Sequence, residues 1–126
     1  MSACVASRDQ AALQDAFLLR TKTLALLDKG TESYASHRQE VTDLNVELQR
    51  AFDRERSRPN NTNTVQMWET LLNENSPLPG SGIYPRFIKQ WETKGTLKPV
   101  YISNKKENVA AAFDKIISLE SAKPAN

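Results

Sequence analysis

The two side chains best suited to nucleophilic or metal chemistry, a cysteine and a histidine, each occur once among the 126 residues. Cys4 and His37 lie far apart in the sequence. A single cysteine cannot form a disulfide within the chain, and a metal site needs several His, Cys or carboxylate ligands at close spacing. A catalytic triad would have to use His37, and no nucleophile in a strained turn accompanies it. We therefore expect no metal, no cofactor and no enzymatic activity.

The other polar groups have the spacing of ordinary structural residues. Glu40 and Asp43 lie in a charge-balanced helical stretch, where solvation and helix-surface ion pairs explain them. Gly80-Ser81-Gly82 lacks the following Lys and the preceding strand of a phosphate-binding loop. His37 lies beside the apolar side of a predicted helix, so we interpret it as a half-buried helix histidine.

The cysteine follows a short targeting-like pattern. Ser2-Ala3-Cys4 resembles the last three residues of a bacterial lipobox, the Leu-Ser/Ala-Ala/Gly-Cys pattern cut by the lipoprotein signal peptidase, with Met1 where the Leu would be. The resemblance implies a small envelope lipoprotein that faces the periplasm, with Cys4 as its lipid attachment point and residues 1–6 as a flexible tether. The alternative is a natural Met start, an unmodified thiol and a cytoplasmic protein.

Positive charge is concentrated in residues 83–106, although the whole chain carries a net charge of only +2. Aromatic residues alternate with the basic ones, and such a pattern can hold phosphate-rich polymers or lipid headgroups. In the alternative interpretation, Phe87 and Trp91 belong to the core and the lysines form a plain solvated face. The candidate basic face consists of Arg86, Lys89, Lys94, Lys98, Lys105 and Lys106.

Apolar residues in the first half of the chain recur with the period of a helix. Their seven-residue register continues through Gly30, and a glycine inside a helix costs only about 1 kcal/mol. We therefore expect one long helix with a soft point at Gly30, in preference to an antiparallel hairpin. Its apolar side is a candidate interaction seam, mostly intrachain core but available in part to a partner helix or a second copy. The seam consists of Leu13, Phe17, Leu24, Leu27, Tyr34, Val41 and Leu48.

The second half of the chain predicts three shorter helices. Pro59 ends the helical arm, and residues 58–63 form a linker. We expect helices over 65–73 and 85–94, a short extended or 3₁₀ piece at 100–102, and a last helix capped by Ser103 or Asn104. No apolar stretch approaches the roughly 20 residues that span a bilayer. The predicted fold is all-α in a single domain, with an arm (7–57) packed on a helical cluster (64–122) and a frayed tail (123–126).

Together these features predict a non-enzymatic, lipid-anchored protein that binds a protein partner or its own copy through the seam. The alternative is a soluble helical module that binds phosphate-rich polymer through residues 83–106. The ligand would be nucleic acid or lipid headgroups, and we rank nucleic acid below a protein partner. A third possibility is a structural subunit whose seam packs inside a larger complex.

Overall fold

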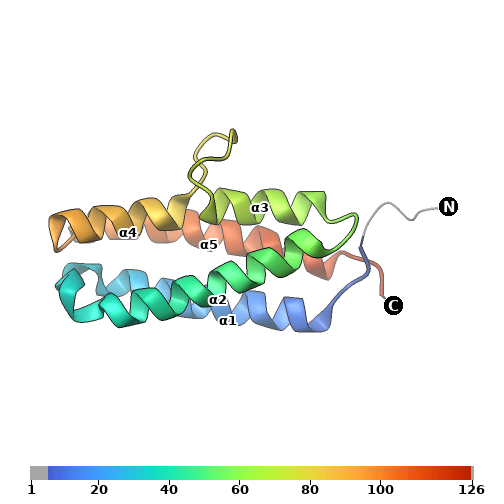
Figure 1. The fold of residues 1–126 in the computed structure, drawn as a ribbon, viewed down its shortest axis with the longest axis horizontal. Helices are drawn as coiled ribbons and strands as arrows, with labels where there is room; N and C mark the ends of the chain where they lie inside the picture. Colours follow the sequence, from blue (N-terminus) through green and yellow to red (C-terminus); the bar gives the residue numbers. More distant parts are fainter. Residues whose placement is uncertain (1–5, 126) are drawn as a thin grey trace.

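The computed structural model describes residues 6–125, in which all regular secondary structure is helical. The predicted all-α fold is confirmed. Figure 1 shows an elongated antiparallel bundle in which α3 and α4 lie end to end and α5 runs beside both. The elements are α1 (Gln10–Asp28), the 3₁₀ turns η1 (Lys29–Thr31) and η2 (Tyr34–His37), α2 (Arg38–Ser57), α3 (Thr62–Leu72), α4 (Ile83–Lys94) and α5 (Pro99–Ser121).

The chain reverses direction after Asp28, so the expected continuous helix is wrong. Helices α1 and α2 pack against each other as an antiparallel hairpin (Figure 1). Leu27, Tyr34 and Val41 are all buried in one core. The seven-residue column thus runs through α1, the turn η2 and α2, and it does not require an unbroken helix.

Gly30 lies where the reversal packs closely against the rest of the bundle. A Cβ atom at this position would lie 2.9 Å from Ile102 Cδ1 and 3.2 Å from Phe87 Cζ. The carbonyl of Gly30 accepts a hydrogen bond from the Leu97 N–H at 2.7 Å, and the Tyr34 N–H donates to the Gly95 carbonyl at 2.8 Å. These bonds join the α1–α2 reversal to the α4–α5 turn at one end of the bundle.

Helices α3 and α4 together form one column of the bundle, interrupted by a projecting loop over residues 73–82 (Figure 1). The loop returns to the bundle at Gly82, whose N–H donates to the Thr70 carbonyl at 2.8 Å. Gly82 has a φ of 77°, and a Cβ there would lie 2.4 Å from the Cα of Glu74. Only glycine fits both the left-handed backbone and this close approach.

Helix α5 begins at Pro99 rather than at the predicted Ser103 or Asn104, and residues 100–102 form its first turn. Proline suits this position because its fixed φ matches a helix and its missing N–H would have no intrahelical partner. The helix then supplies the predicted core residues Val109, Phe113 and Ile116, all buried. Trp68 of α3 packs edge-on against Phe113, with 5.9 Å between ring centroids.

Candidate interaction surfaces

Helix α1 exposes apolar side chains in addition to those that it buries. Phe17 is 53% exposed and its neighbour Leu18 is 51% exposed, at the middle of the helix. The other large hydrophobic residues exposed in the described part of the chain, Val46 and Val100, are on other helices. Adjacent exposed apolar side chains make this part of α1 a candidate contact surface. We call the exposed side of this helix the outer face of α1, consisting of Ala11, Gln14, Phe17, Leu18, Thr21 and Ala25.

The structure distributes the predicted seam between the core and the surface. Four of its residues are buried, namely Leu27, Tyr34, Val41 and Leu48. Leu13 and Leu24 are half-buried, and Phe17 alone is exposed. Leu18 was missed by the sequence analysis, because it lies outside the apolar stripe that faces the core. A usable signal was present, since Ala11, Leu18 and Ala25 repeat at seven-residue steps on the other side of the helix.

Charged side chains border the outer face of α1. On the side toward α2, Asp15 accepts from Arg54 at 2.6 Å and Lys22 donates to Glu47 at 2.7 Å. On the side toward α5, Arg20 donates to Asp114 at 2.9 Å. Every one of these side chains is at least one third exposed. Exposed pairs of this kind contribute only about 0–1 kcal/mol each, so their charges remain available to a partner.

The six residues of the candidate basic face point in different directions. Lys106 reaches α1, where it pairs with Asp28 at 2.5 Å, whereas Lys89 pairs with Glu74 of the 73–82 loop at 3.0 Å. Lys94 and Lys98 are exposed at the α4–α5 turn. The segment therefore does not present one continuous basic surface. Its aromatic residues Phe87 and Trp91 are fully buried, as the alternative interpretation expected.

Arg86 and Lys105 nevertheless line a common groove of about 450 Å³, with Met67 and Ile83 among its apolar walls. The Arg86 guanidinium is held by two backbone carbonyls, those of Ser81 at 2.9 Å and Glu74 at 3.2 Å. Carbonyl oxygens fix the side chain without neutralising its charge. Lys105 lies over the Tyr101 ring, 5.5 Å from its centroid. The groove thus combines two cations with an apolar surface.

His37 lies in a cluster at the end of the bundle where the α1–α2 reversal meets the α4–α5 turn. Its Nδ1 lies 2.7 Å from Glu40 Oε1 and its Nε2 lies 2.7 Å from Glu32 Oε1, so the ring can donate to both carboxylates only when it is protonated. These hydrogen bonds, with Glu40 first, raise the pKa of His37 above its ordinary 6.5 and outweigh burial, which acts in the opposite direction. The cluster therefore has a structural role, and we call His37 with Glu32 and Glu40 the clamp. The sequence predicted a half-buried helix histidine, whereas His37 is a buried residue of the 3₁₀ turn η2.

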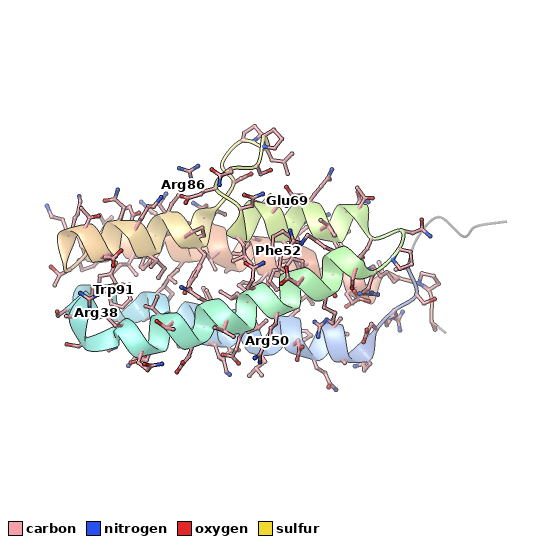
Figure 2. The ribbon with its side chains drawn as sticks, viewed as in Figure 1. Arg38, Arg50, Phe52, Glu69, Arg86 and Trp91 are labelled. Atoms are coloured by element: carbon pink, nitrogen blue, oxygen red, sulfur yellow. The ribbon has the colours of Figure 1, made fainter. Side chains whose placement is uncertain are left out.

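The aromatic side of this cluster is built on Trp91. The His37 ring packs on the indole at 5.7 Å between centroids, and Tyr34 meets it edge-on at 5.3 Å. The indole N–H donates to the Glu32 carbonyl at 2.9 Å. Figure 2 shows Trp91 together with Arg38 at this end of the bundle, where Arg38 lies over the Tyr34 ring.

A second buried polar cluster closes the opposite end, where the two ends of the described chain meet. Glu120 and Lys123, both buried, are 2.9 Å apart, and Lys123 also donates to Asn61. The Ala6 N–H donates to the Asn60 carbonyl at 3.0 Å, and the Arg8 N–H donates to the Pro124 carbonyl at 2.8 Å. Lys123 is thus part of the bundle and does not fray as predicted. Cys4 lies outside the described residues.

Comparison with known proteins found no matching family model, curated protein or solved structure. Within residues 6–125, no helix is long and apolar enough to cross a membrane. In the same part of the chain, no three His, Cys, Asp or Glu side chains gather as metal ligands would.

Proposed function

We propose that the protein is a non-catalytic interaction module that docks a protein partner on the outer face of α1 and is held at a bacterial membrane by lipid on Cys4. The observation that carries the docking surface is the exposure of Phe17 and Leu18 side by side. Full burial of one such side chain contributes about 1.5–3 kcal/mol. A partner that covers both gains a substantial part of the free energy of a specific complex.

The path of the chain supports a lipid anchor on Cys4 at one particular end of the bundle. Ala6 and Arg8 are hydrogen-bonded to the α2–α3 connection and to the C-terminal segment, respectively. Cys4 lies two residues before Ala6. A lipid on its thiol would thus hold the bundle by the end that carries the Glu120 cluster. The outer face of α1 begins one residue after the start of the helix and remains accessible along its length.

Site-specific photo-crosslinking in bacterial cells tests the docking surface. A photoreactive residue in place of Leu18 should yield a covalent protein adduct, because this side chain would lie at the centre of the contact. The same residue in place of Val100, which is 69% exposed on α5, is the matched control and should yield none. Equal adducts at both positions, or none at position 18, would contradict the proposal.

Mass spectrometry of the protein purified from bacterial membranes tests the anchor. The expected product has diacylglycerol in thioether linkage on Cys4, and the Cys4→Ser variant should be recovered in the aqueous fraction. An unmodified Cys4 thiol in the membrane-made protein would overturn the anchor and leave the docking surface to be judged by crosslinking.

A second candidate function, binding of phosphate-bearing lipid headgroups, is favoured by the groove that Arg86 and Lys105 share. Such binding should weaken steeply as salt rises, because the two cations are screened. The Arg86→Glu and Lys105→Glu variants should lose binding to anionic vesicles, whereas Lys94→Glu, an exposed lysine away from the groove, should retain it. Binding that is unaffected by salt and by all three changes would exclude this function.

A further inference from the structure

We infer that the partner on the outer face of α1 is a second copy of this chain, docked with its α1 antiparallel to the first. The inference rests on the proposed function, which it makes specific. It is drawn from the order of charges beside Phe17 and Leu18, because that order is self-complementary under a two-fold rotation.

The first complementary pair lies on the side toward α2. Asp15 and Lys22 are both on this side, since they pair with Arg54 and Glu47 of α2. They lie at equal distances before and after a point between residues 18 and 19 of α1. A two-fold axis through that point brings Asp15 opposite Lys22 of the second copy, and Lys22 opposite its Asp15. A parallel two-fold arrangement would instead bring the side toward α2 against the side toward α5 of the second copy, so Asp15 would not lie opposite Lys22.

The second complementary pair lies on the side toward α5 and shares the same centre. Phe17 and Arg20 are also equidistant from the point between residues 18 and 19. The axis therefore places the Arg20 guanidinium near the Phe17 ring of the second copy, where a cation–π contact is favourable. Leu18 lies next to the axis and meets its own copy. Two independent pairs with one centre are what an isologous contact requires.

The outer face of α1 favours a second copy over a strongly charged partner. Its bordering charges are of both signs, with Asp15 on one side of the centre and Lys22 on the other. A strongly acidic or basic partner would meet repulsion at one of the two. Helix α1 has 19 residues, about 28 Å of length, so the contact is small and the dimer weak in dilute solution. Attachment to a membrane would raise the local concentration of the protein and favour the dimer.

Disulfide trapping tests the antiparallel register in a Cys4→Ser background. Ala11 and Ala25 are exposed, and the proposed axis brings each close to the other across the dimer. A mixture of the Ala11→Cys and Ala25→Cys proteins should form the mixed disulfide at least tenfold faster than either protein forms its own, because a disulfide requires Cα atoms within about 7 Å. Val100→Cys mixed with either protein is the control for random collision, since Val100 is exposed on another helix.

The outcomes separate this inference from the proposed function. Faster self-disulfides of Ala11→Cys than of the mixture, or rates equal to the control, would overturn the antiparallel dimer. The mass of the adduct crosslinked from position 18 in cells then gives the second readout. An adduct of two copies of the chain supports the inference. An adduct with a different protein would overturn the antiparallel dimer and support the docking surface on α1. The absence of any adduct would overturn both the dimer and the docking surface.

Discussion

Arg58 donates to Glu120 at 2.8 Å across 62 positions of the sequence, with side chains that are 14% and 2% exposed. Arg58 also bonds Glu55 at 2.8 Å and the Ser7 carbonyl at 2.7 Å. Three parts of the chain therefore meet at one guanidinium and one carboxylate: the N-terminal segment, the end of α2 and the end of α5. Asn61, just before α3, joins the same cluster through Glu55 and Lys123. This contact closes the end of the bundle to which the proposed lipid is attached.

Removal of the Glu120 charge should destabilise the bundle. The Glu120→Gln variant leaves the buried Lys123 without a carboxylate and Arg58 with Glu55 alone, and loss of one partner from a buried pair typically costs about 3–5 kcal/mol. Urea unfolding followed by circular dichroism measures the free energy of unfolding. The Asp114→Asn variant removes an exposed carboxylate, 61% accessible, and should change the free energy of unfolding by less than about 1 kcal/mol. Equal effects of the two changes would contradict the importance of the buried cluster.

The free energy of unfolding at acid pH should also depend on Glu120. Burial raises the pKa of this carboxyl, but hydrogen bonds from Arg58, the Asp9 N–H and Lys123 outweigh burial and lower the pKa to about 2, from the ordinary 4.5. A depressed pKa in the folded state means that the stabilisation is complete above pH 4.5 and is lost as the pH falls toward 2. The Glu120→Gln variant should therefore lose less stability than the wild type over this interval, as measured by urea unfolding at successive pH values.

His37 should have the opposite pH dependence. Because Glu40 and Glu32 raise the pKa of the folded-state imidazole, the stabilisation is complete below pH 6.5 and is lost as the pH rises through the raised value. Titration by NMR is direct, since His37 is the only histidine in the chain. The expected midpoint lies above 6.5. In the Glu32→Gln/Glu40→Gln variant burial remains and the carboxylates are gone, so the midpoint should fall below that of the wild type; an unchanged midpoint would contradict the clamp.

The close contact at Gly30 predicts a coupled pair of substitutions. Gly30→Ala forces its new methyl group against Ile102 Cδ1, and overpacking of this kind costs about 1–3 kcal/mol. Ile102→Val removes that Cδ1 atom. In a double-mutant cycle on unfolding free energies, Gly30→Ala should therefore be less harmful in the Ile102→Val background than in the wild type. Strict additivity of the two changes would mean that the methyl group at position 30 is accommodated without a contact with Ile102 Cδ1.

The helical content and much of the core could be predicted from the sequence, because they depend on local periodicity. Val109, Phe113 and Ile116 follow the helical spacing, and all three are buried. The direction of the chain at Gly30 could not be predicted in the same way. In this chain the seven-residue spacing of apolar residues happens to continue across the turn, and the close approach of Ile102 and Phe87 to Gly30 is visible only in the structure.

The polar clusters depended on contacts between distant parts of the chain. Glu120 and Arg58 lie 62 positions apart, and no spacing rule connects them. The partners of His37 are local, so Glu32 and Glu40 gave a signal that the sequence analysis did not use. The candidate docking surface was predicted only in part. Phe17 was predicted as part of the seam, whereas the seven-residue repeat that contains Leu18 gave a signal that the sequence analysis did not use.

Sedimentation equilibrium of the Cys4→Ser protein, compared with its Leu18→Asp variant, tests the role of the outer face of α1 most directly. The wild-type side chain is half exposed, so the variant should fold normally while a carboxylate lies at the centre of the contact. The expected result is a rise in mass with concentration from 14.2 kDa toward twice that value, and a constant 14.2 kDa for Leu18→Asp. A wild-type mass that stays at the monomer value, or a variant that associates equally well, would contradict the account.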